Sequence, residues 1–217
     1  MSSMDTMMLL GSSFIELAEH EPLDKISVSD IVAASNKNRK TFYYHFDGKD
    51  SLAQWIFRRD MADVLTQSIK EDELVHEDCL GGRFPALPYY MRRKSGVRSL
   101  DGSVFIEMLA TCLQNRRSFY AKLLRKTGPE SLREYLKELY VPAMADDIRF
   151  ILSNRYLAEC NIRFLSEFYV GAIVTYVSDK LCDPICTDIL ADIKPFQNIV
   201  HSSLESEIKK QQLKRVL

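Results

Sequence analysis

Long apolar runs are missing from this sequence of 217 residues. No stretch approaches the roughly 18 uninterrupted apolar residues that a membrane span requires. The first residues also lack the basic segment and the cleavage site of a secretory signal. We therefore expect a cytoplasmic protein that has no membrane partner.

Cysteine is scarce and scattered, and the five cysteines lie at positions 79, 112, 160, 182 and 186. An odd, scattered set argues against the disulfide framework of a small secreted protein. Cys182 and Cys186 are four residues apart, but Pro184 lies between them and no histidine or second close cysteine pair accompanies them. We expect no zinc or other metal site, and no cofactor.

The residue patterns typical of enzymes are missing as well. The sequence has no glycine-rich phosphate loop, and its four histidines, at positions 20, 45, 76 and 201, have no matching nucleophile or paired carboxylates nearby. The chain is therefore not expected to be an enzyme. Its net charge of −1 neither requires nor excludes a polyanionic partner, so any patch that binds nucleic acid must be local.

Glycine and proline are also scarce, at eight and seven residues, and they are concentrated in a few places. The segments between them carry apolar residues at spacings of three and four, which predicts an all-α protein. The apolar content of 46% excludes wholesale disorder. A chain of this length can bury a sizeable core and form one domain or two.

The first two helices have clear boundary signals. An apolar stripe predicts a helix that ends near His20, before the stop at Glu21-Pro22. Ser27 is placed to cap the backbone amide of Asp30, and this predicts a second, short helix that ends near Ala34.

A turn at 35–37 and two further helices follow. Asn38 is a good capping residue for a third short helix that reaches about Phe46. A longer helix is expected from Lys49 to about Glu73. The pattern breaks at Val75 to Gly82, where a domain boundary or hinge is expected.

The rest of the chain also reads as helical. Helices are expected at Pro85 to Arg93, Val104 to Arg117, Ser118 to Lys126, Glu130 to Tyr156 and Glu159 to Leu181. Asp183-Pro184 is expected to start another helix. Pro195 either kinks that helix or begins a final one.

Two short helices joined by a tight turn, with an apolar inner face and a polar outer face, are what reading the major groove of DNA requires. In the third helix Phe42 and Phe46 are expected to face inward. The outer arc then carries polar residues suited to base edges and phosphates, namely Asn38, Arg39, Lys40, Thr41, Tyr43 and His45. The alternative is a solvated basic turn on an ordinary helical protein.

The order of these residues favours the first interpretation. Ile26-Ser-Val-Ser-Asp-Ile-Val, followed by Arg39-Lys-Thr-Phe-Tyr-Tyr-His-Phe-Asp-Gly-Lys-Asp-Ser-Leu52, closely resembles the N-terminal signature of TetR-family regulators. The resemblance covers about residues 5–60, and the segment Phe164 to Leu181 is similar to a helix of that family's ligand domain. It implies a phosphate contact from Ser27, base or phosphate contacts from Arg39, Lys40, Thr41 and Tyr43, and a clamp on the DNA backbone by His45 and Lys49.

Three positions depart from the family's pattern. Asn36 replaces a glycine of the turn, but asparagine also tolerates the left-handed conformation, so the turn is expected to form. Lys37 replaces a small apolar residue, and its stem must snorkel or the turn must open slightly. Lys40 replaces a glycine of the recognition helix and adds a charge to the groove face.

The resemblance also implies a division of the chain. Residues 1–50 form a three-helix helix-turn-helix domain, 51–74 a connecting helix, and 83–217 a larger helical domain that binds an effector and dimerises. The expected homodimer interface consists of Phe164, Phe168, Gly171, Ala172, Thr175 and Tyr176. The alternative for this stripe is simple intramolecular core.

An effector pocket inside the C-terminal domain is implied in the same way. The candidates for its lining are Phe105, Met108, Leu109, Cys112, Phe119, Tyr120, Tyr140, Met144, Phe168 and Tyr169. Plain core is the alternative for each of them. A run of cations without an acid could bind an anionic effector, lie near DNA or be a solvated loop, and consists of Arg83, Arg92, Arg93, Lys94 and Arg98.

Two hypotheses of function follow. The first is a homodimeric repressor that a small-molecule effector releases from a double-stranded DNA operator. The second is a regulator or adaptor, acting as activator or otherwise, that a protein partner controls and that has no small-molecule pocket. A cavity in the C-terminal domain would separate them, since a solid core with a leftover apolar patch favours the protein partner.

Overall fold

The computed structural model describes residues 3–78, 82–92, 102–152 and 157–213. Within these ranges the chain is all-α, as predicted, apart from one two-stranded sheet. The helices are α1 (Ser3–His20), α2 (Val28–Ala34), α3 (Arg39–His45), α4 (Lys49–Ser68), α5 (Gly102–Asn115), α6 (Arg117–Arg125), α7 (Leu132–Leu152), α8 (Glu159–Cys182) and α9 (Ile189–Leu213). A 3-10 turn, η1 (Glu71–Glu73), precedes strands β1 (Leu74–Val75) and β2 (Tyr90–Met91).

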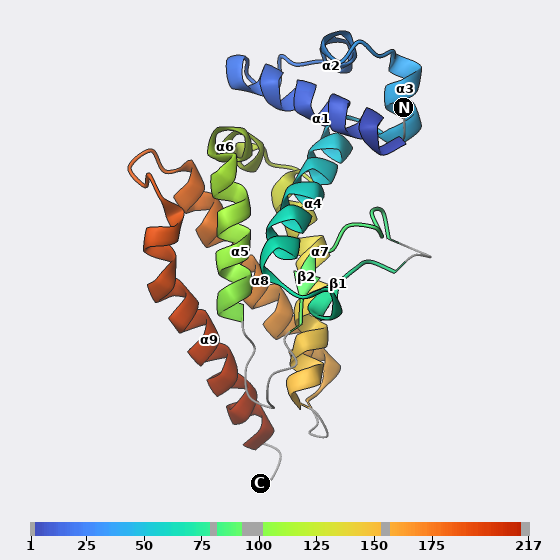
Figure 1. Ribbon diagram of the computed structural model, residues 1–217. Coiled ribbons are helices and arrows are strands. Elements are labelled where there is room, and N and C mark those ends of the chain that lie inside the picture. Colours follow the sequence, from blue (N-terminus) through green and yellow to red (C-terminus); the bar gives the residue numbers. More distant parts are fainter. Residues whose placement is uncertain (1–2, 79–81, 93–101, 153–156, 214–217) are drawn as a thin grey trace.

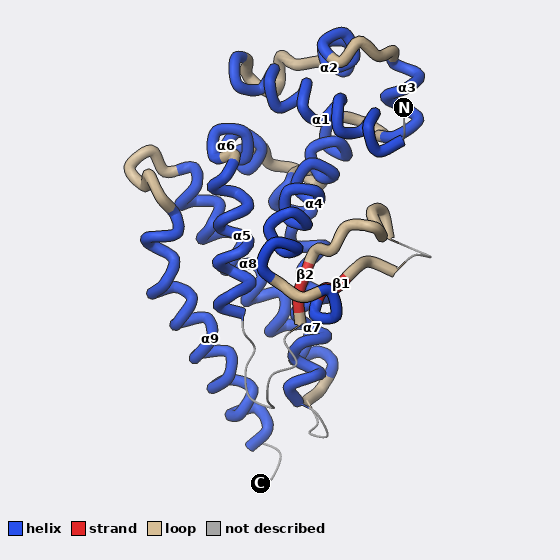
Figure 2. Tube along the Cα trace, viewed as in Figure 1, coloured by secondary structure: helices blue, strands red, loops and turns tan. Residues whose placement is uncertain are grey.

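Helices α1, α2 and α3 gather at one end of the molecule, and α4 runs from them into a bundle made by α5 to α9 (Figure 1). In the bundle α7 packs along α8, and α5 packs along α9. Strands β1 and β2 pair antiparallel and form a small ladder beside the helices (Figure 2). In the described part of the chain, no helix is long and apolar enough to cross a membrane.

The predicted caps of the two short helices are confirmed. The backbone N–H of Asp30 donates to Ser27 Oγ over 3.3 Å, and the backbone N–H of Ser27 donates to Asp30 Oδ2 over 2.8 Å. This reciprocal pair satisfies two backbone donors that the start of a helix otherwise leaves open. Asn38 Oδ1 accepts from the backbone N–H of Thr41 over 2.8 Å and begins α3 in the same way.

The turn between α2 and α3 forms as predicted, with Asn36 in the left-handed region at φ 51°. The backbone N–H of Asn36 donates to the carbonyl of Ala33 (3.1 Å), and that of Lys37 donates to the carbonyl of Val32 (2.7 Å). These two bonds are the Schellman arrangement, which closes the last turn of a helix and redirects the chain. The Lys37 side chain is half-buried.

Trp55 joins the N-terminal helices to α4. Its side chain is 1% exposed, and its ring centroid lies 5.9 Å from that of Phe46, the residue that ends α3. On its other side α1 approaches closely, because a Cβ atom at Gly11 would lie only 3.1 Å from Trp55 Cζ3. A larger residue at position 11 would therefore push α1 away from α4.

Helix α4 buries charged residues as well as apolar ones. Arg58 is completely buried and donates to the backbone carbonyls of Leu87 (2.6 Å) and Phe84 (3.3 Å). Asp60 accepts from the Tyr120 hydroxyl (2.7 Å) and from Arg116 Nε (3.0 Å). These contacts fasten α4 to the segment 82–89 and to the start of α6.

Two predictions for the middle of the chain are wrong. Helix α4 ends at Ser68 and not near Glu73, since Ile69 turns to an extended conformation, buries its side chain and leads toward β1. Pro85 to Arg92 do not form a helix, and Arg93 lies outside the described residues. Proline disfavours helical backbone at the residue before it, so Pro85 and Pro88 together prevent a helix here. Tyr90 and Met91 pair with β1 instead.

The helices expected after residue 102 are confirmed, with small shifts at their ends. The predicted end of α7 at Tyr156 lies outside the described residues. The helix expected to start at Asp183-Pro184 begins only at Ile189, because side chains of Asp183 and Asp188 accept bonds from backbone amides in short turns. Pro195 lies inside one continuous α9.

Candidate nucleic-acid interface

Helix α3 has one buried face and one exposed face. Phe42 is 0% exposed and Phe46 is buried, with their ring centroids 5.8 Å apart, so both face inward. Arg39, Lys40 and Tyr43 are exposed on the rest of the helix. The local sequence thus folds so that the aromatic pair holds the helix while the cations remain in solvent.

Two of the predicted DNA-contacting residues also hold the start of the helix. The Thr41 hydroxyl donates to Asn38 Oδ1 over 3.1 Å, and the same oxygen already accepts the backbone N–H of Thr41. The Asn38 amide group therefore offers its nitrogen, a donor, to an outside partner. Thr41 and His45 are half-buried at the edges of the exposed face.

Tyr44 was missed in the sequence and is more exposed than Tyr43, at 82% against 51%. It follows Phe42 by two residues, so at 100° per residue it lies nearly opposite the buried ring and one turn after Lys40. Its ring packs edge-on against His45, with centroids 4.9 Å apart. The helical position relative to Phe42 was the signal that could have identified it.

Ser27 caps the start of α2, and Lys49 binds the backbone just before it. The Ser27 hydroxyl donates to Asp30 Oδ2 over 2.6 Å, and these hydrogen bonds from Ser27 hold the pKa of Asp30 below its ordinary value. Lys49 Nζ donates to the backbone carbonyl of Leu23 (2.8 Å) and to that of Ile26. Lys49 thus ties the loop between α1 and α2 to the start of α4, a role that the sequence did not indicate.

Helix α6 connects the bundle to the N-terminal helices. Lys122 Nζ donates to the carbonyls of Ala18 and Glu21 at the end of α1, the latter over 3.3 Å. Lys126 Nζ lies 2.6 Å from Asp50 Oδ2 in the first turn of α4. The bundle therefore contacts the N-terminal unit through lysine side chains as well as through α4.

The predicted effector-pocket residues are only partly brought together. Phe105, Leu109, Tyr140 and Met144 line a cavity of about 10 Å³ between α5, α7 and α8. That volume is about the minimum for one water molecule. The buried hydroxyl of Tyr140 has no hydrogen-bond partner among the described residues.

The remaining predicted pocket residues lie elsewhere. Phe119 packs edge-on against Phe14 of α1, with ring centroids 5.6 Å apart, while Tyr120 donates to Asp60. The Tyr169 hydroxyl donates to Ser203 Oγ of α9 over 3.1 Å. Cys112 is buried, Met108 is half-buried, and Phe168 is exposed on α8.

The predicted dimer residues lie on the outer side of α8. Phe164 and Phe168 are 59% and 58% exposed, and their rings stack with centroids 6.1 Å apart. Thr175 is exposed, while Gly171 and Ala172 are half-buried. Tyr176 stacks on Phe196 of α9 at 4.0 Å. The other apolar residues of the helix, Leu165, Tyr169, Ile173 and Val177, are buried in the bundle.

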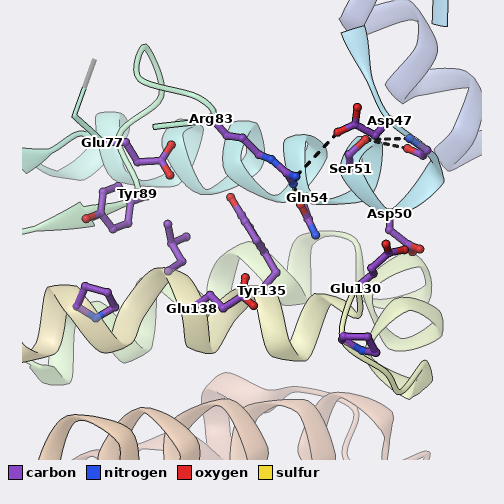
Figure 3. Close-up of a pocket in the computed structure, with 14 residues that line it drawn as sticks. Asp47, Asp50, Ser51, Gln54, Glu77, Arg83, Tyr89, Glu130, Tyr135 and Glu138 are labelled. Atoms are coloured by element: carbon purple, nitrogen blue, oxygen red, sulfur yellow. Dashed lines mark hydrogen bonds and ion pairs between the residues drawn. The ribbon is translucent and has the colours of Figure 1, made fainter. Parts of the chain in front are cut away.

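A large cavity of about 640 Å³ lies between the first half of α4, the segment around residues 77–89 and the start of α7 (Figure 3). Arg83 reaches into it and donates to Gln54 Oε1 over 2.6 Å. Of the other predicted cations, Arg92 pairs with Asp146 at 3.1 Å, whereas Arg93, Lys94 and Arg98 lie outside the described residues. The described residues contain no cluster of potential metal ligands.

Both ends of the chain match known regulator families. Residues 15–55 match the family described as "Bacterial regulatory proteins, tetR family". Residues 103–209 match "Transcriptional regulator C-terminal region" of the TetR type. The first match covers α2 and α3 with their flanks, and the second covers nearly all of the bundle.

Individual relatives are more distant. Over 66 residues the chain is 32% identical to the HTH-type dhaKLM operon transcriptional activator DhaS of Lactococcus lactis subsp. lactis. The matched segment makes up 30% of this chain and 35% of that relative, so the likeness spans about a third of its length.

One solved structure supports the fold. The chain resembles the dihydroxyacetone kinase operon activator DhaS at 16% identity with a TM-score of 0.53, covering 95% of this chain and 98% of that one. The TetR family repressor AlkX from Dietzia sp. is 15% identical, with 89% and 98% covered and a TM-score of 0.35. With its helix-turn-helix and its helical C-terminal region both matched, the chain belongs to the TetR family of DNA-binding transcriptional regulators.

Proposed function

We propose that this protein is a homodimeric repressor that binds a double-stranded DNA operator through α3 and is released by a small-molecule effector. The division of α3 into a buried phenylalanine face and an exposed basic and aromatic face carries this proposal. A helix held from one side in this way can enter the major groove with its other side. The working division of the chain is 1–50 for DNA binding, 51–74 as connecting helix and 83–217 for effector binding and dimerisation.

Each predicted contact has a chemical role in this proposal. Arg39 and the Asn38 amide nitrogen suit base edges, whereas Lys40, Thr41, Tyr43 and His45 suit phosphates. Ser27 lies at the positive end of α2 and suits a phosphate as well. The Lys49 ammonium is already engaged with two backbone carbonyls, so its main contribution to binding is to hold the start of α2 in place.

The homodimer rests on the outer face of α8. Two large apolar rings exposed one turn apart, at Phe164 and Phe168, are costly to leave in water. A two-fold dimer through this face would place two copies of α3 on operator half-sites about 34 Å apart, one turn of DNA. An effector that favours a different subunit arrangement would misplace the two helices and lower operator affinity.

Sequencing the DNA fragments that the purified protein retains tests DNA binding and symmetry together. The expected result is a two-fold symmetric motif whose half-sites are separated by one helical turn or a multiple of it. Sedimentation of wild type and of Phe164→Glu/Phe168→Glu tests the interface, since the double variant should become monomeric and keep its helix content. Retained fragments without a common motif would overturn sequence-specific operator binding. An unchanged dimer in the double variant would overturn the α8 interface.

The second candidate is a regulator that a protein partner controls. The nearly filled core around Tyr140, with a cavity of about 10 Å³, favours this reading for the interior of the bundle. The similar DhaS of L. lactis is called an activator, which also makes activation a candidate here. Transcription in vitro from the selected operator separates the two, because the purified protein alone should lower transcript yield if it is a repressor and leave it unchanged if it needs a partner.

A further inference from the structure

The cavity of about 640 Å³ between α4 and α7 is large enough for a small molecule. It lies at the junction of the N-terminal helices with the bundle (Figure 3). None of the residues expected to line an effector pocket contributes to it. It is therefore a different site from the one that the sequence predicted.

The cavity has a strongly acidic lining, with five carboxylates and the single cation Arg83. Arg58 neutralises Glu77 at 2.6 Å, and Lys126 neutralises Asp50 at 2.6 Å. Asp47 faces Arg83 at 3.9 Å.

Glu130 and Glu138 form no ion pair with any residue that the structure describes. Glu130 lies in the turn that precedes α7, and Glu138 lies in the second turn of that helix. A ligand anion would meet these two uncompensated carboxylates, whereas a cation would be attracted to them.

Gln54 gives the cavity a second, independent polar feature. Gln54 is only 8% exposed, and its Oε1 accepts a hydrogen bond from the Arg83 guanidinium. This bond fixes the orientation of the amide, so that Nε2 is the free end, and Nε2 has no partner among the described residues. The side chain extends from α4 toward α7 (Figure 3). This nitrogen is a donor that remains open toward the cavity, and an acceptor oxygen of a ligand would pair with it.

We propose that this cavity binds an organic cation that also carries a hydrogen-bonding oxygen. Its ammonium group lies near Glu130 and Glu138, and its oxygen accepts from Gln54 Nε2. Tyr135 lies between the two glutamates in the sequence and also lines the cavity. Its ring supplies an aromatic surface for the cation. This inference rests on the proposed function, because it gives the effector a site and a chemical class.

The position of the cavity gives such a ligand access to the DNA-binding unit. Asp47 and Gly48, which connect α3 to α4, are part of the lining. A ligand held between this connection and α7 would fix the angle between α3 and the bundle.

Calorimetric titration of the full-length protein tests the site with three cations, choline, tyramine and spermidine. Choline has a matched neutral control, 3,3-dimethylbutan-1-ol, which keeps its shape and hydroxyl group and lacks its charge. At least one of the cations should bind saturably at one site per chain, more weakly as salt is added. The neutral alcohol should not bind. Absence of saturable binding by all three cations, or equal binding of the alcohol, overturns the proposal.

The variant Glu130→Gln/Glu138→Gln should weaken cation binding by several-fold and at most about thirtyfold, since each exposed charge pair contributes up to about 1 kcal/mol. Glu71→Gln/Glu107→Gln changes the net charge equally at exposed positions outside the cavity and should bind like wild type. Both variants should keep the thermal unfolding midpoint of wild type. Equal weakening in the two variants would show general charge attraction and overturn the site.

Operator affinity, measured in parallel with and without the cation, separates this inference from the proposed function. Cation binding that leaves operator affinity unchanged supports the site and overturns release by an effector at this place. Normal operator binding without any cation binding overturns the site and leaves the DNA-binding function standing.

Discussion

The guanidinium of Arg58 and the carboxylate of Glu77 lie 2.6 Å apart, and this ion pair holds Glu77 against the middle of α4. Arg58 also lies over the ring of Tyr89, with its Cζ 5.0 Å from the ring centroid. The buried positive charge of Arg58 is tolerated because the segment 82–89 is not helical. Its Phe84 and Leu87 carbonyls are therefore available to accept hydrogen bonds from Arg58. Glu77, held in this way, lines the acidic cavity together with Tyr89.

Arg58→Ala is expected to lower the free energy of unfolding by about 3–5 kcal/mol, because it removes the cation that pairs with Glu77 and the donor to the Leu87 carbonyl. Urea unfolding followed by circular dichroism measures this loss. Arg149→Ala provides the control, since Arg149 pairs with Asp146 and Glu159 in solvent and should matter by less than about 1 kcal/mol. Equal stabilities of the two variants would contradict the anchoring role of Arg58.

Phe42 and Tyr44 should respond in opposite ways to replacement by alanine. Phe42→Ala removes a fully buried ring and should cost about 3–5 kcal/mol of stability. Tyr44→Ala should leave the unfolding midpoint unchanged and weaken operator binding, because its ring is 82% exposed on the groove side of α3. Paired thermal melts and gel-shift titrations on a selected operator measure both effects. An unaltered operator affinity in Tyr44→Ala would remove this residue from the interface.

Arg39→Ala should relax base preference and not only raise sensitivity to salt. Arginine reads guanine by two parallel hydrogen bonds, which alanine cannot replace. Selection of bound sequences at two salt concentrations distinguishes the two effects, since a lost phosphate contact changes the salt slope and leaves the preferred sequence intact. An unchanged preferred sequence would make Arg39 a phosphate contact.

The helix boundaries near residues 27–46 could be predicted because capping is local: Ser27 with Asp30, and Asn38 with Thr41, are three residues apart. The anchoring roles of Arg58 and Lys49 could not, since their partners lie more than 18 residues away in the sequence. The effector pocket was implied by the family resemblance, and its candidate lining was chosen among aromatic, apolar and sulfur residues at helical spacing. That spacing marks any buried helix face, and the face around Tyr140 is filled by its own side chains.

Lys49→Ala should destabilise the N-terminal helices as well as weaken DNA binding. The ammonium donates to the carbonyls of Leu23 and Ile26, and losing these charged hydrogen bonds should cost about 1–3 kcal/mol. Hydrogen exchange of the backbone amides in α2, compared with Lys40→Ala as an exposed control, measures the effect. Wild-type protection of α2 in Lys49→Ala would show that the lysine acts on DNA alone.

Asn36 should tolerate glycine better than alanine, since its φ of 51° lies in the left-handed region. Asn36→Gly should leave the free energy of unfolding unchanged or raise it. Asn36→Ala should lower it by about 1–2 kcal/mol, because a Cβ in this conformation crowds the following carbonyl without the local hydrogen bonds that asparagine offers. Denaturant unfolding of the three proteins gives the order. An alanine variant as stable as the glycine variant would contradict it.

Asp147 should make stability depend on pH. Burial raises the pKa of its carboxyl from 3.8 to about 6, against the opposing effects of the Tyr90 hydroxyl and Arg92. The folded protein therefore binds a proton more tightly than the unfolded chain, and stability falls by up to about 3 kcal/mol as pH rises from about 4 to about 6. It should stay level above that window.

Asp147→Asn should lack this contribution, so its stability relative to wild type should increase between pH 4 and pH 7. Unfolding at several pH values measures the difference, with Asp146→Asn as the control at an exposed position beside it. A constant difference across the window would show that folding does not raise the pKa of the Asp147 carboxyl.

Trp55 is the one tryptophan of the sequence, and it lies where Gly11, Phe46 and Arg59 meet. Because indole emission shifts in wavelength when its surroundings become wetter or more polar, the unmodified protein contains its own optical reporter. The intensity and colour of that emission should follow any loosening of α1 or α3 from α4. Movement of these helices on DNA binding can thus be recorded in real time, on one protein, without attaching a dye.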